Sequence, residues 1–189
     1  TYRKGDVSFG HNRLAIIDVE NGRQPMTRAH GGRCYTIVYN GELYNSPELL
    51  KIVRANGIEP TTRCDTELVL DLYMLFGDAC ASMLNGIFAF AIHDETTGEV
   101  YLARDRFGIK PLFYARIRDG IAFASEIKAL LGHPEIRPDV DRRGLWELLF
   151  LSPVRLSGGV FRDIREIDPA CQAVWRGGEK LEISRYWKL

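Results

Sequence analysis

One short segment of the sequence carries a compact pair of hydrogen-bond donors. Asn40 and Gly41 directly follow the apolar run 34–39, so a side-chain amide stands beside a glycine backbone N–H. Two such donors at the end of a rigid strand could stabilise a negative charge that develops on oxygen, as an oxyanion hole does. The same dipeptide is also typical of a type I′ hairpin turn, whose two central residues need positive φ. The sequence leaves both interpretations open.

Two charged residues could recognise the two ends of a free amino acid. Arg13 enters the apolar run 14–17, and its planar guanidinium matches the geometry of a carboxylate. Asp65 stands at a predicted helix start, where it could accept hydrogen bonds from an ammonium group. Each also has a structural interpretation. Arg13 could be a strand-end cation with a buried stem, and Asp65 could belong to a Thr62-x-x-Asp65 capping box at the helix N-terminus.

Two glycine-containing segments are not interpreted as phosphate sites. The segment 104–111 holds three cations, one anion, a glycine and a proline, and we interpret it as a solvated loop pinned by an Asp–Arg pair. The segment 157–160 reads Ser-Gly-Gly-Val, but Phe161 stands where a phosphate-cradling loop needs a polar residue. We therefore expect no nucleotide site in either segment.

The cysteines and histidines give no support for a metal site. The sequence contains no C-x-x-C pair and no H-x-H or H-x-x-x-H spacing, which are the patterns typical of zinc ligands. We interpret all four cysteines as free thiols in a reducing compartment. They are Cys34, Cys64, Cys80 and Cys171.

Composition favours a folded protein that binds neither nucleic acid nor a membrane. The 189 residues include 25 Lys+Arg and 25 Asp+Glu, a formal net charge of zero, and 46% are hydrophobic. A nucleic-acid binder would usually show a basic excess. The longest apolar run, 86–92, is far shorter than the roughly 20 residues that span a bilayer. We expect a single domain over residues 1–189 and a cytoplasmic location.

The elements that must position these residues form an α+β pattern. Alternating or apolar runs between short turns predict strands at 7–11, 14–18, 34–39, 87–93, 100–104, 112–115, 121–124, 171–175 and 181–186. Apolar spacing of three and four residues predicts helices at 65–76, 125–131 and 140–151, and another that is capped by Ser46 and ends at Gly57. Short connections imply antiparallel neighbours, so we expect two packed antiparallel sheets with helices outside.

Seven ordered motifs together resemble the class II glutamine amidotransferase domain of asparagine synthetases, and the resemblance covers nearly the whole chain. The motifs are GHNRLAIID at 10–18, QPM at 24–26, YNGELYN at 39–45, CDTE at 64–67, LNGIFAFAI at 84–92, ARDRFGIKPL at 103–112 and FASEIKAL at 123–130.

The resemblance implies a fold and part of a substrate site. The fold would be that of the N-terminal-nucleophile hydrolases, with two antiparallel sheets between helices in four αββα layers. Arg13 would hold the α-carboxylate of glutamine, and the backbone around Ile16 and Ile17 would assist it.

The resemblance also assigns the donor pair and the carboxylate. Asn40 and the Gly41 N–H would form the oxyanion hole, while Asp65, with Gly41 and Glu42 nearby, would orient the α-amino group. Cys64 departs from the serine that the family commonly has, a small-for-small change that should leave Asp65 undisturbed.

The catalytic nucleophile of that family is the thiol of an N-terminal cysteine, with its own α-amino group as the base. This sequence begins with Thr1, which we do not interpret as a nucleophile, and the four internal cysteines should lie within strands or helices. We expect that several tens of residues precede this chain in the full-length protein and that the 189 residues alone do not hydrolyse glutamine.

The resemblance implies partners outside this chain. Glutamine would be the substrate, and ammonia would pass to a C-terminal synthetase domain that binds ATP and Mg²⁺. No cofactor or metal is expected in this domain, and a homodimer is possible. Two alternatives stay open: an amidotransferase of the same family with another acceptor, and a non-catalytic scaffold or regulatory module.

Overall fold

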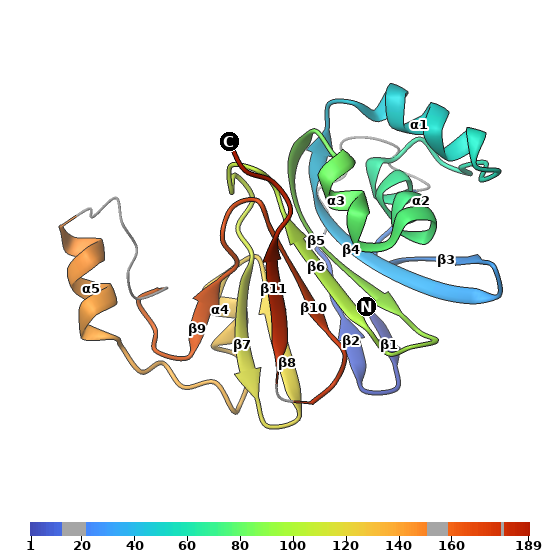
Figure 1. Cartoon of the computed structure of the whole chain (residues 1–189). Coiled ribbons are helices and arrows are strands. Elements are labelled where there is room, and N and C mark those ends of the chain that lie inside the picture. The colour runs from blue at the N-terminus through green and yellow to red at the C-terminus, as the bar shows by residue number, and fades with distance from the viewer. Residues whose placement is uncertain (13–21, 151–158, 179) are drawn as a thin grey trace. The chain divides into compact units, whose positions relative to one another are not determined.

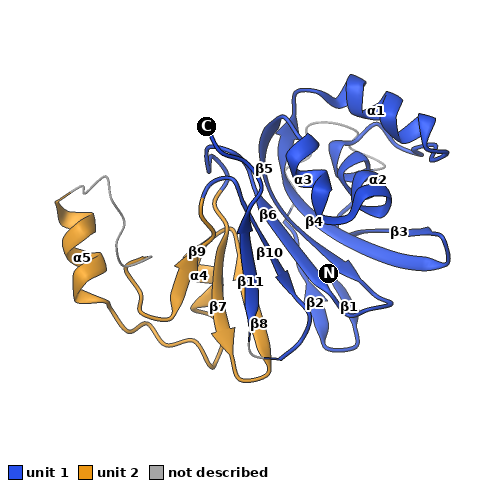
Figure 2. Ribbon diagram, in the orientation of Figure 1, with its two compact units in different colours: residues 1–110, 169–189 blue, residues 111–168 orange. Residues whose placement is uncertain are grey.

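The computed structural model describes residues 1–12, 22–150, 159–178 and 180–189. Arg13, Ile16, Ile17 and the strand predicted at 14–18 lie outside the described residues. The chain forms two compact units, shown in Figure 2. Unit 1 comprises residues 1–110 and 169–189, and unit 2 comprises residues 111–168.

The main sheet of unit 1 has six strands, and every neighbouring pair in it is antiparallel (Figure 1). Its order is β11-β10-β6-β5-β4-β3. The strands are β3 (Met26–His30), β4 (Arg33–Leu43), β5 (Gly86–Asp94), β6 (Val100–Arg104), β10 (Cys171–Trp175) and β11 (Leu181–Arg185). The longest ladder joins β4 and β5, and it carries the segment that contains the predicted donor pair.

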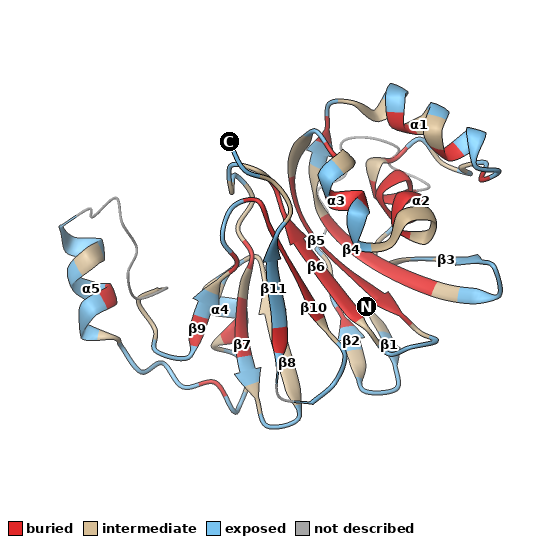
Figure 3. Ribbon diagram, viewed as in Figure 1, coloured by how far each residue is buried: buried red, intermediate tan, exposed pale blue. Residues whose placement is uncertain are grey.

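The helices of unit 1 lie between β4 and β5 in the chain and pack on one face of the six-stranded sheet (Figure 1). They are α1 (Ser46–Ala55), α2 (Asp65–Phe76), the 3₁₀ turn η1 (Gly77–Ala79) and α3 (Cys80–Met83). Alternate residues of β4, namely Tyr35, Ile37 and Tyr39, belong to the core cluster beneath α2. Figure 3 shows that the central strands β4, β5 and β6 are mainly buried, whereas β3 and β11 are largely exposed.

Helix α2 has the predicted bounds, whereas the predicted cap of α1 is wrong. Ser46 is the first residue of α1, and Asn45 is its N-cap. The Asn45 amide instead donates to the Met83 carbonyl and accepts from the Asn85 N–H, both at 3.0 Å. Since these contacts span about 40 positions, local spacing did not reveal them.

A smaller antiparallel pair, β1 (Tyr2–Lys4) with β2 (Val7–Phe9), also belongs to unit 1. The sequence predicted β2 but not β1 or β3. Both missed strands are mainly polar and largely exposed, so they lack the apolar signal of a strand.

Unit 2 contains a three-stranded antiparallel sheet of order β8-β7-β9. Its elements are β7 (Phe113–Ile117), β8 (Gly120–Ala124), α4 (Ile127–Leu130), α5 (Arg142–Leu149) and β9 (Ile164–Glu166). The strand β9 was not predicted, and both helices are shorter than predicted. The α+β class with antiparallel sheets is confirmed. No helix in the described part of the chain has the length and apolarity that a membrane span requires.

Candidate functional site

The predicted donor pair lies within strand β4 and not in a turn. Asn40 pairs with Ala89 of β5, and Gly41 pairs with Phe88. The ladder continues to the pair between Leu43 and Gly86. The type I′ hairpin interpretation is therefore wrong, because an eleven-residue strand paired along nine positions overrides the local turn tendency of Asn-Gly.

Gly41 is required by the close approach of β5. A Cβ atom at this position would lie 2.8 Å from Phe88 Cα and closer still to the Ile87 carbonyl oxygen. The approach is mutual, because a Cβ on Gly86 would lie 3.0 Å from Leu43 Cα and closer to the Glu42 carbonyl oxygen. Both contacts are with backbone, which cannot rotate aside as a side chain can. The glycine is therefore needed for packing, and this requirement is independent of the predicted donor role.

The backbone groups of Gly41 face the edge of β4 that points away from β5. On that edge the Tyr39 N–H donates to Gln24 and the Leu43 N–H donates to Asp65. Alternate residues of an antiparallel strand direct their N–H and C=O groups to the same side, so Gly41 shares this edge. Among the described residues, no partner outside the sheet ladder is found for either group. The Gly41 N–H therefore lies between two N–H groups that bind side chains, those of Tyr39 and Leu43.

The side chain of Asn40 lies on the sheet face opposite to that of Tyr39, as alternation along a strand requires. Tyr39 is buried beneath the helices, whereas Asn40 is only half-buried. Asn40, which adjoins Gly41, is therefore less buried than Tyr39. The two donors that the sequence singled out thus stay on adjacent residues of a strand and not in a turn, with the Gly41 N–H at the strand edge and the Asn40 side chain on a face of the sheet.

Asp65 connects the end of β4 with the start of α1. Its Oδ2 accepts the Leu43 N–H at 2.8 Å, and its Oδ1 accepts the Ser46 hydroxyl at 3.0 Å. The predicted capping box is wrong, because Cys64 is the N-cap of α2 and caps through no side-chain bond. A carboxylate offers about four lone-pair sites, so these two bonds leave acceptor capacity for an ammonium group.

Glu67 organises the loop before α2 in the way expected of Asp65. Its carboxylate accepts the Thr61 N–H and hydroxyl, each at 2.8 Å, and the Thr62 N–H at 2.5 Å. Burial acts to raise the pKa of Glu67, but these donors outweigh it and hold the pKa below the usual range. Glu67 is therefore a buried anion that fixes the N-terminal turn of α2.

A buried ion cluster joins α2 to β3. One Arg28 nitrogen contacts Glu67 Oε1 at 2.5 Å and the two oxygens of Asp71 at 2.7 and 2.9 Å. Burial raises the pKa of Asp71 to about 7, and the negative charge of Glu67 adds to this effect while Arg28 opposes it. The cluster holds α2 against the edge strand of the sheet.

The buried Tyr39 phenol lies within electrostatic reach of Asp65, the predicted amino-group site. The hydroxyl of Tyr39 has no hydrogen-bond partner in the part of the chain that the structure describes, although the residue is only 4% exposed. Burial raises the pKa of Tyr39, and the negative charges of Asp65 and Glu42 raise it further. The phenol therefore stays protonated and is able to donate a hydrogen bond.

The segment after β6 is more buried than predicted and is held through backbone groups. Asp105 is fully buried. Its carboxylate accepts hydrogen bonds from the backbone N–H groups of Phe88, Phe107, Ile109 and Lys110. Arg104 donates to the Gly108 and Lys110 carbonyls, at 2.8 and 2.7 Å. The prediction of a solvated loop pinned by an Asp–Arg pair is therefore wrong. The segment is a turn whose backbone N–H groups surround the buried Asp105 carboxylate, which also binds the N–H of Phe88, the residue paired with Gly41.

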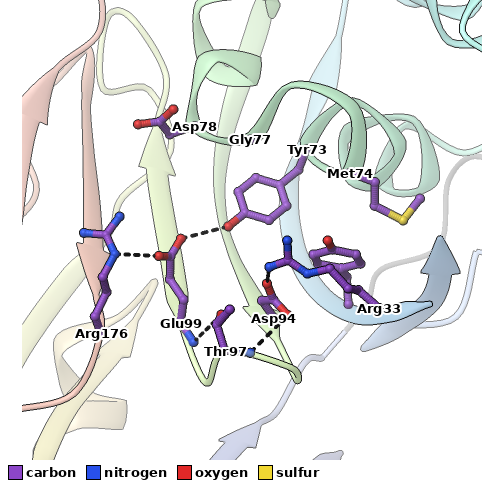
Figure 4. A pocket seen from close by; sticks show the side chains of 10 residues that line it. Arg33, Tyr73, Met74, Gly77, Asp78, Asp94, Thr97, Glu99 and Arg176 are labelled. Atoms are coloured by element: carbon purple, nitrogen blue, oxygen red, sulfur yellow. Dashed lines mark hydrogen bonds and ion pairs between the residues drawn. The ribbon is translucent and has the colours of Figure 1, made fainter. Parts of the chain in front are cut away.

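A polar cleft of about 340 Å³ lies elsewhere in unit 1 (Figure 4). Glu99 accepts the Tyr73 hydroxyl at 3.1 Å and pairs with Arg176 at 2.8 Å, while Arg33 pairs with Asp94. Arg33 precedes Asn40 by seven positions on the same strand, which corresponds to about 24 Å at 3.4 Å per residue. The cleft is therefore separate from the donor pair, and its charged side chains largely pair with one another.

Three of the four cysteines lie within a strand or helix, as predicted, whereas the prediction is wrong for Cys64, which immediately precedes α2. Cys34 is in β4, Cys80 in α3 and Cys171 in β10, while Cys64 caps α2, and all four are free thiols. Burial raises the pKa of Cys80 to about 12, so this thiol is not a nucleophile at neutral pH. Within the described ranges, no group of three His, Cys, Asp or Glu side chains is arranged to hold a metal ion.

The fold has a counterpart among solved structures. It is similar to that of the glutamine phosphoribosylpyrophosphate amidotransferase of Bacillus subtilis, solved with ADP and GMP, with a TM-score of 0.61. The similarity covers 87% of this chain and 32% of that chain at 24% sequence identity, so it bears on the fold alone. The predicted N-terminal-nucleophile fold is confirmed.

The sequence comparisons define the family. Residues 1–187 match the glutamine amidotransferase domain, and the chain belongs to this family. It is 48% identical over 184 residues to asparagine synthetase (glutamine-hydrolysing) 3 of Bacillus subtilis strain 168, covering 97% of this chain and 30% of that protein. It is 37% identical to asparagine synthetase (glutamine-hydrolysing) 1 of the same organism, covering 96% of this chain and 28% of that protein. The chain thus spans less than a third of these relatives.

Proposed function

We propose that this chain acts as the glutaminase domain of a glutamine-dependent asparagine synthetase. Within the full-length protein, which would supply the N-terminal cysteine, this domain would hydrolyse glutamine to glutamate and ammonia, and a C-terminal synthetase domain would use the ammonia for ATP-dependent amidation of aspartate. The similarity to two glutamine-hydrolysing asparagine synthetases, over nearly all of this chain and about 30% of theirs, supports this proposal. ATP and Mg²⁺ would belong to the synthetase domain, and the reaction would take place in the cytoplasm.

The observation that carries the proposal is the edge of β4. There the Gly41 N–H lies between the Tyr39 N–H, which binds Gln24, and the Leu43 N–H, which binds Asp65. The family's N-terminal thiolate would attack the side-chain amide carbon of glutamine. The negative charge that develops on the amide oxygen would be stabilised by the Gly41 N–H and the Asn40 amide. Ammonia then leaves with a proton from the catalytic base, and water cleaves the thioester to release glutamate and the thiol.

The substrate would be recognised by its two charged ends. Asp65 would accept hydrogen bonds from the α-ammonium group, for which its carboxylate keeps free lone pairs beside its two protein donors. Glu42, which is exposed two residues from Asn40, would assist it. Arg13 and the backbone of Ile16 and Ile17 would bind the α-carboxylate, an assignment that stays a prediction because these residues lie outside the described ranges.

The test is glutamine hydrolysis by the full-length protein and by two variants. Asn40→Ala should lower kcat by about 10²-fold or more, because it removes one oxyanion donor. Arg13→Ala should raise KM for glutamine and leave kcat nearly unchanged, since a carboxylate contact is equal in ground and transition states. Thermal unfolding of both variants provides the control. If Asn40→Ala lowered the melting temperature without changing kcat, Asn40 would be a structural residue and the proposed site would be wrong.

A further inference from the structure

Strand β3 stops pairing with β4 two positions before Tyr39, and a side chain continues the ladder. The last backbone pair joins Met26 to Ile37. Pro25 precedes Met26 and has no N–H with which to extend a ladder. Opposite Tyr39, the Gln24 Oε1 accepts the Tyr39 N–H at 2.6 Å, and Gln24 Nε2 donates to the Tyr39 carbonyl at 3.0 Å. A primary amide thus supplies the one acceptor and one donor that a strand residue would have supplied.

The same side chain reaches α2. Gln24 Nε2 also donates to Thr66 Oγ1 at 3.1 Å, and Thr66 is buried in the first turn of that helix. Tyr39 immediately precedes Asn40 in the chain, and Thr66 immediately follows Asp65. One amide therefore contacts the neighbour of the oxyanion donor and the neighbour of the proposed ammonium acceptor.

We propose that Gln24 is a positioning residue for glutamine hydrolysis. It fixes the separation between the donors at Asn40 and Gly41 and the carboxylate of Asp65, and it touches none of the reacting atoms. This inference rests on the proposed function. Its physical basis is preorganisation, since displacing catalytic donors by about 1 Å can cost up to 10²-fold in rate.

Loss of Gln24 should act locally, because other contacts hold the same elements. Arg28 still ties β3 to α2 through Glu67 and Asp71, and β5 still pairs with the other edge of β4. What is lost is the support of the Tyr39 backbone on the part of this edge that β3 does not cover. Gln24→Ala should therefore fold and retain the sheet.

The first measurement is amide hydrogen exchange on this chain, which needs no activity. In Gln24→Ala the Tyr39 amide should exchange at least tenfold faster than in the wild type. The Ile37 amide faces the same edge and lies opposite Met26 of β3, so it should keep its protection and serves as the internal control. Unchanged protection at Tyr39 would overturn the inference whatever the chain catalyses.

The second measurement is the kinetics of glutamine hydrolysis by the full-length protein. Gln24→Ala should lower kcat about tenfold, a smaller loss than that of Asn40→Ala because the donors are displaced and not removed. Thr66→Val keeps both bonds to Tyr39 and removes only the bond to α2. It should raise KM about fivefold, the equivalent of one hydrogen bond, with kcat within twofold of the wild type.

A matched control separates positioning from general destabilisation. Tyr101→Phe removes another hydroxyl of unit 1, which lies 2.9 Å from Gln172 Oε1 and 3.2 Å from the Asp78 carbonyl oxygen, and should lower the melting temperature while leaving kcat and KM within twofold. If Gln24→Ala did not fold, Gln24→Glu would replace it, since it keeps the acceptor for the Tyr39 N–H and loses both donated bonds. Gln24 variants with wild-type kcat and KM would refute the inference, whereas a wild-type protein without glutaminase activity would refute the proposed function.

Discussion

Replacement of Gly41 by alanine tests the central feature of the site, the close approach of β4 and β5. The added methyl group would lie 2.8 Å from both Phe88 Cα and Phe88 Cβ and closer still to the Ile87 carbonyl oxygen. Carbon and oxygen atoms of neighbouring strands normally approach to about 3.3–3.6 Å. The two strands must therefore separate by about 1 Å at this pair. The hydrogen bond from the Phe88 N–H to Asp105, on the other side of β5, opposes this separation.

The expected cost follows from two effects. Forcing a methyl group into a filled site typically costs about 1–3 kcal/mol. Separation of the strands also weakens the flanking ladder bonds, each worth about 1 kcal/mol. Loss of two such bonds brings the total to about 3–5 kcal/mol, a large part of the roughly 5–15 kcal/mol that stabilises a typical domain. The melting temperature should fall by about 10 °C for a chain of this length.

The assay is thermal and urea unfolding of Gly41→Ala beside two other glycine variants of this chain. Gly86→Ala should lose comparable stability, because its Cβ would meet the backbone of Glu42 and Leu43. Gly10→Ala should stay within about 0.5 kcal/mol of the wild type, since Gly10 is exposed and nothing lies within 4 Å of its Cβ position. A Gly41→Ala protein as stable as Gly10→Ala would refute the strand register on which the candidate site depends.

Two further predictions concern the acidic residues of α2. Asp65→Asn should raise KM for glutamine at least tenfold with little change in kcat, because an amide binds an ammonium group poorly. Glu67→Gln is the control for Asp65→Asn. It should lower only the urea midpoint, because the partners of Glu67 are protein groups, namely Thr61, Thr62 and Arg28. For Asp71, burial raises the pKa from 3.8 to about 7, so the folded state binds more protons than the unfolded state between those values. Stability should therefore fall as pH rises from about 4 to 7, by at most about 4 kcal/mol. Asp71→Asn should remove this part of the pH dependence in urea unfolding, and an unchanged profile would contradict the assignment.

The sequence predicted best those elements whose own residues determine their structure. Helix α2 has the predicted bounds because its apolar side chains repeat every three to four residues. Strand β4 extends four residues beyond the predicted end, since its partner β5 stabilises residues that would favour a turn in isolation. The unpredicted strands β1, β3 and β9 are three to five residues long, so their pairing depends on neighbours that local patterns do not reveal.

The same distinction applies to the candidate site. Asn40, Gly41 and Asp65 could be selected from the sequence, because donor pairs and helix-start carboxylates carry a local signature. Gln24 could not, because its contacts lie 15 and 42 positions away. The Tyr39 hydroxyl gave no signal either, since the sequence does not show which buried polar groups lack a partner.

Gly41 permits close strand packing on one side and offers a hydrogen-bond donor on the other. Substitutions at other positions are therefore needed to test the site. Toward β5, the missing side chain permits the strands to approach. On the side away from β5, the Gly41 N–H lies between the Tyr39 and Leu43 N–H groups, which bind side chains. A substitution at Gly41 therefore changes stability and the donor together and cannot separate them. Asn40→Ala alters a donor without adding steric conflict, and Gln24→Ala alters donor position without removing a donor. A loss of kcat in both, with Tyr101→Phe showing only a loss of stability, would assign the chemistry to Asn40 and to the edge of β4 that faces away from β5.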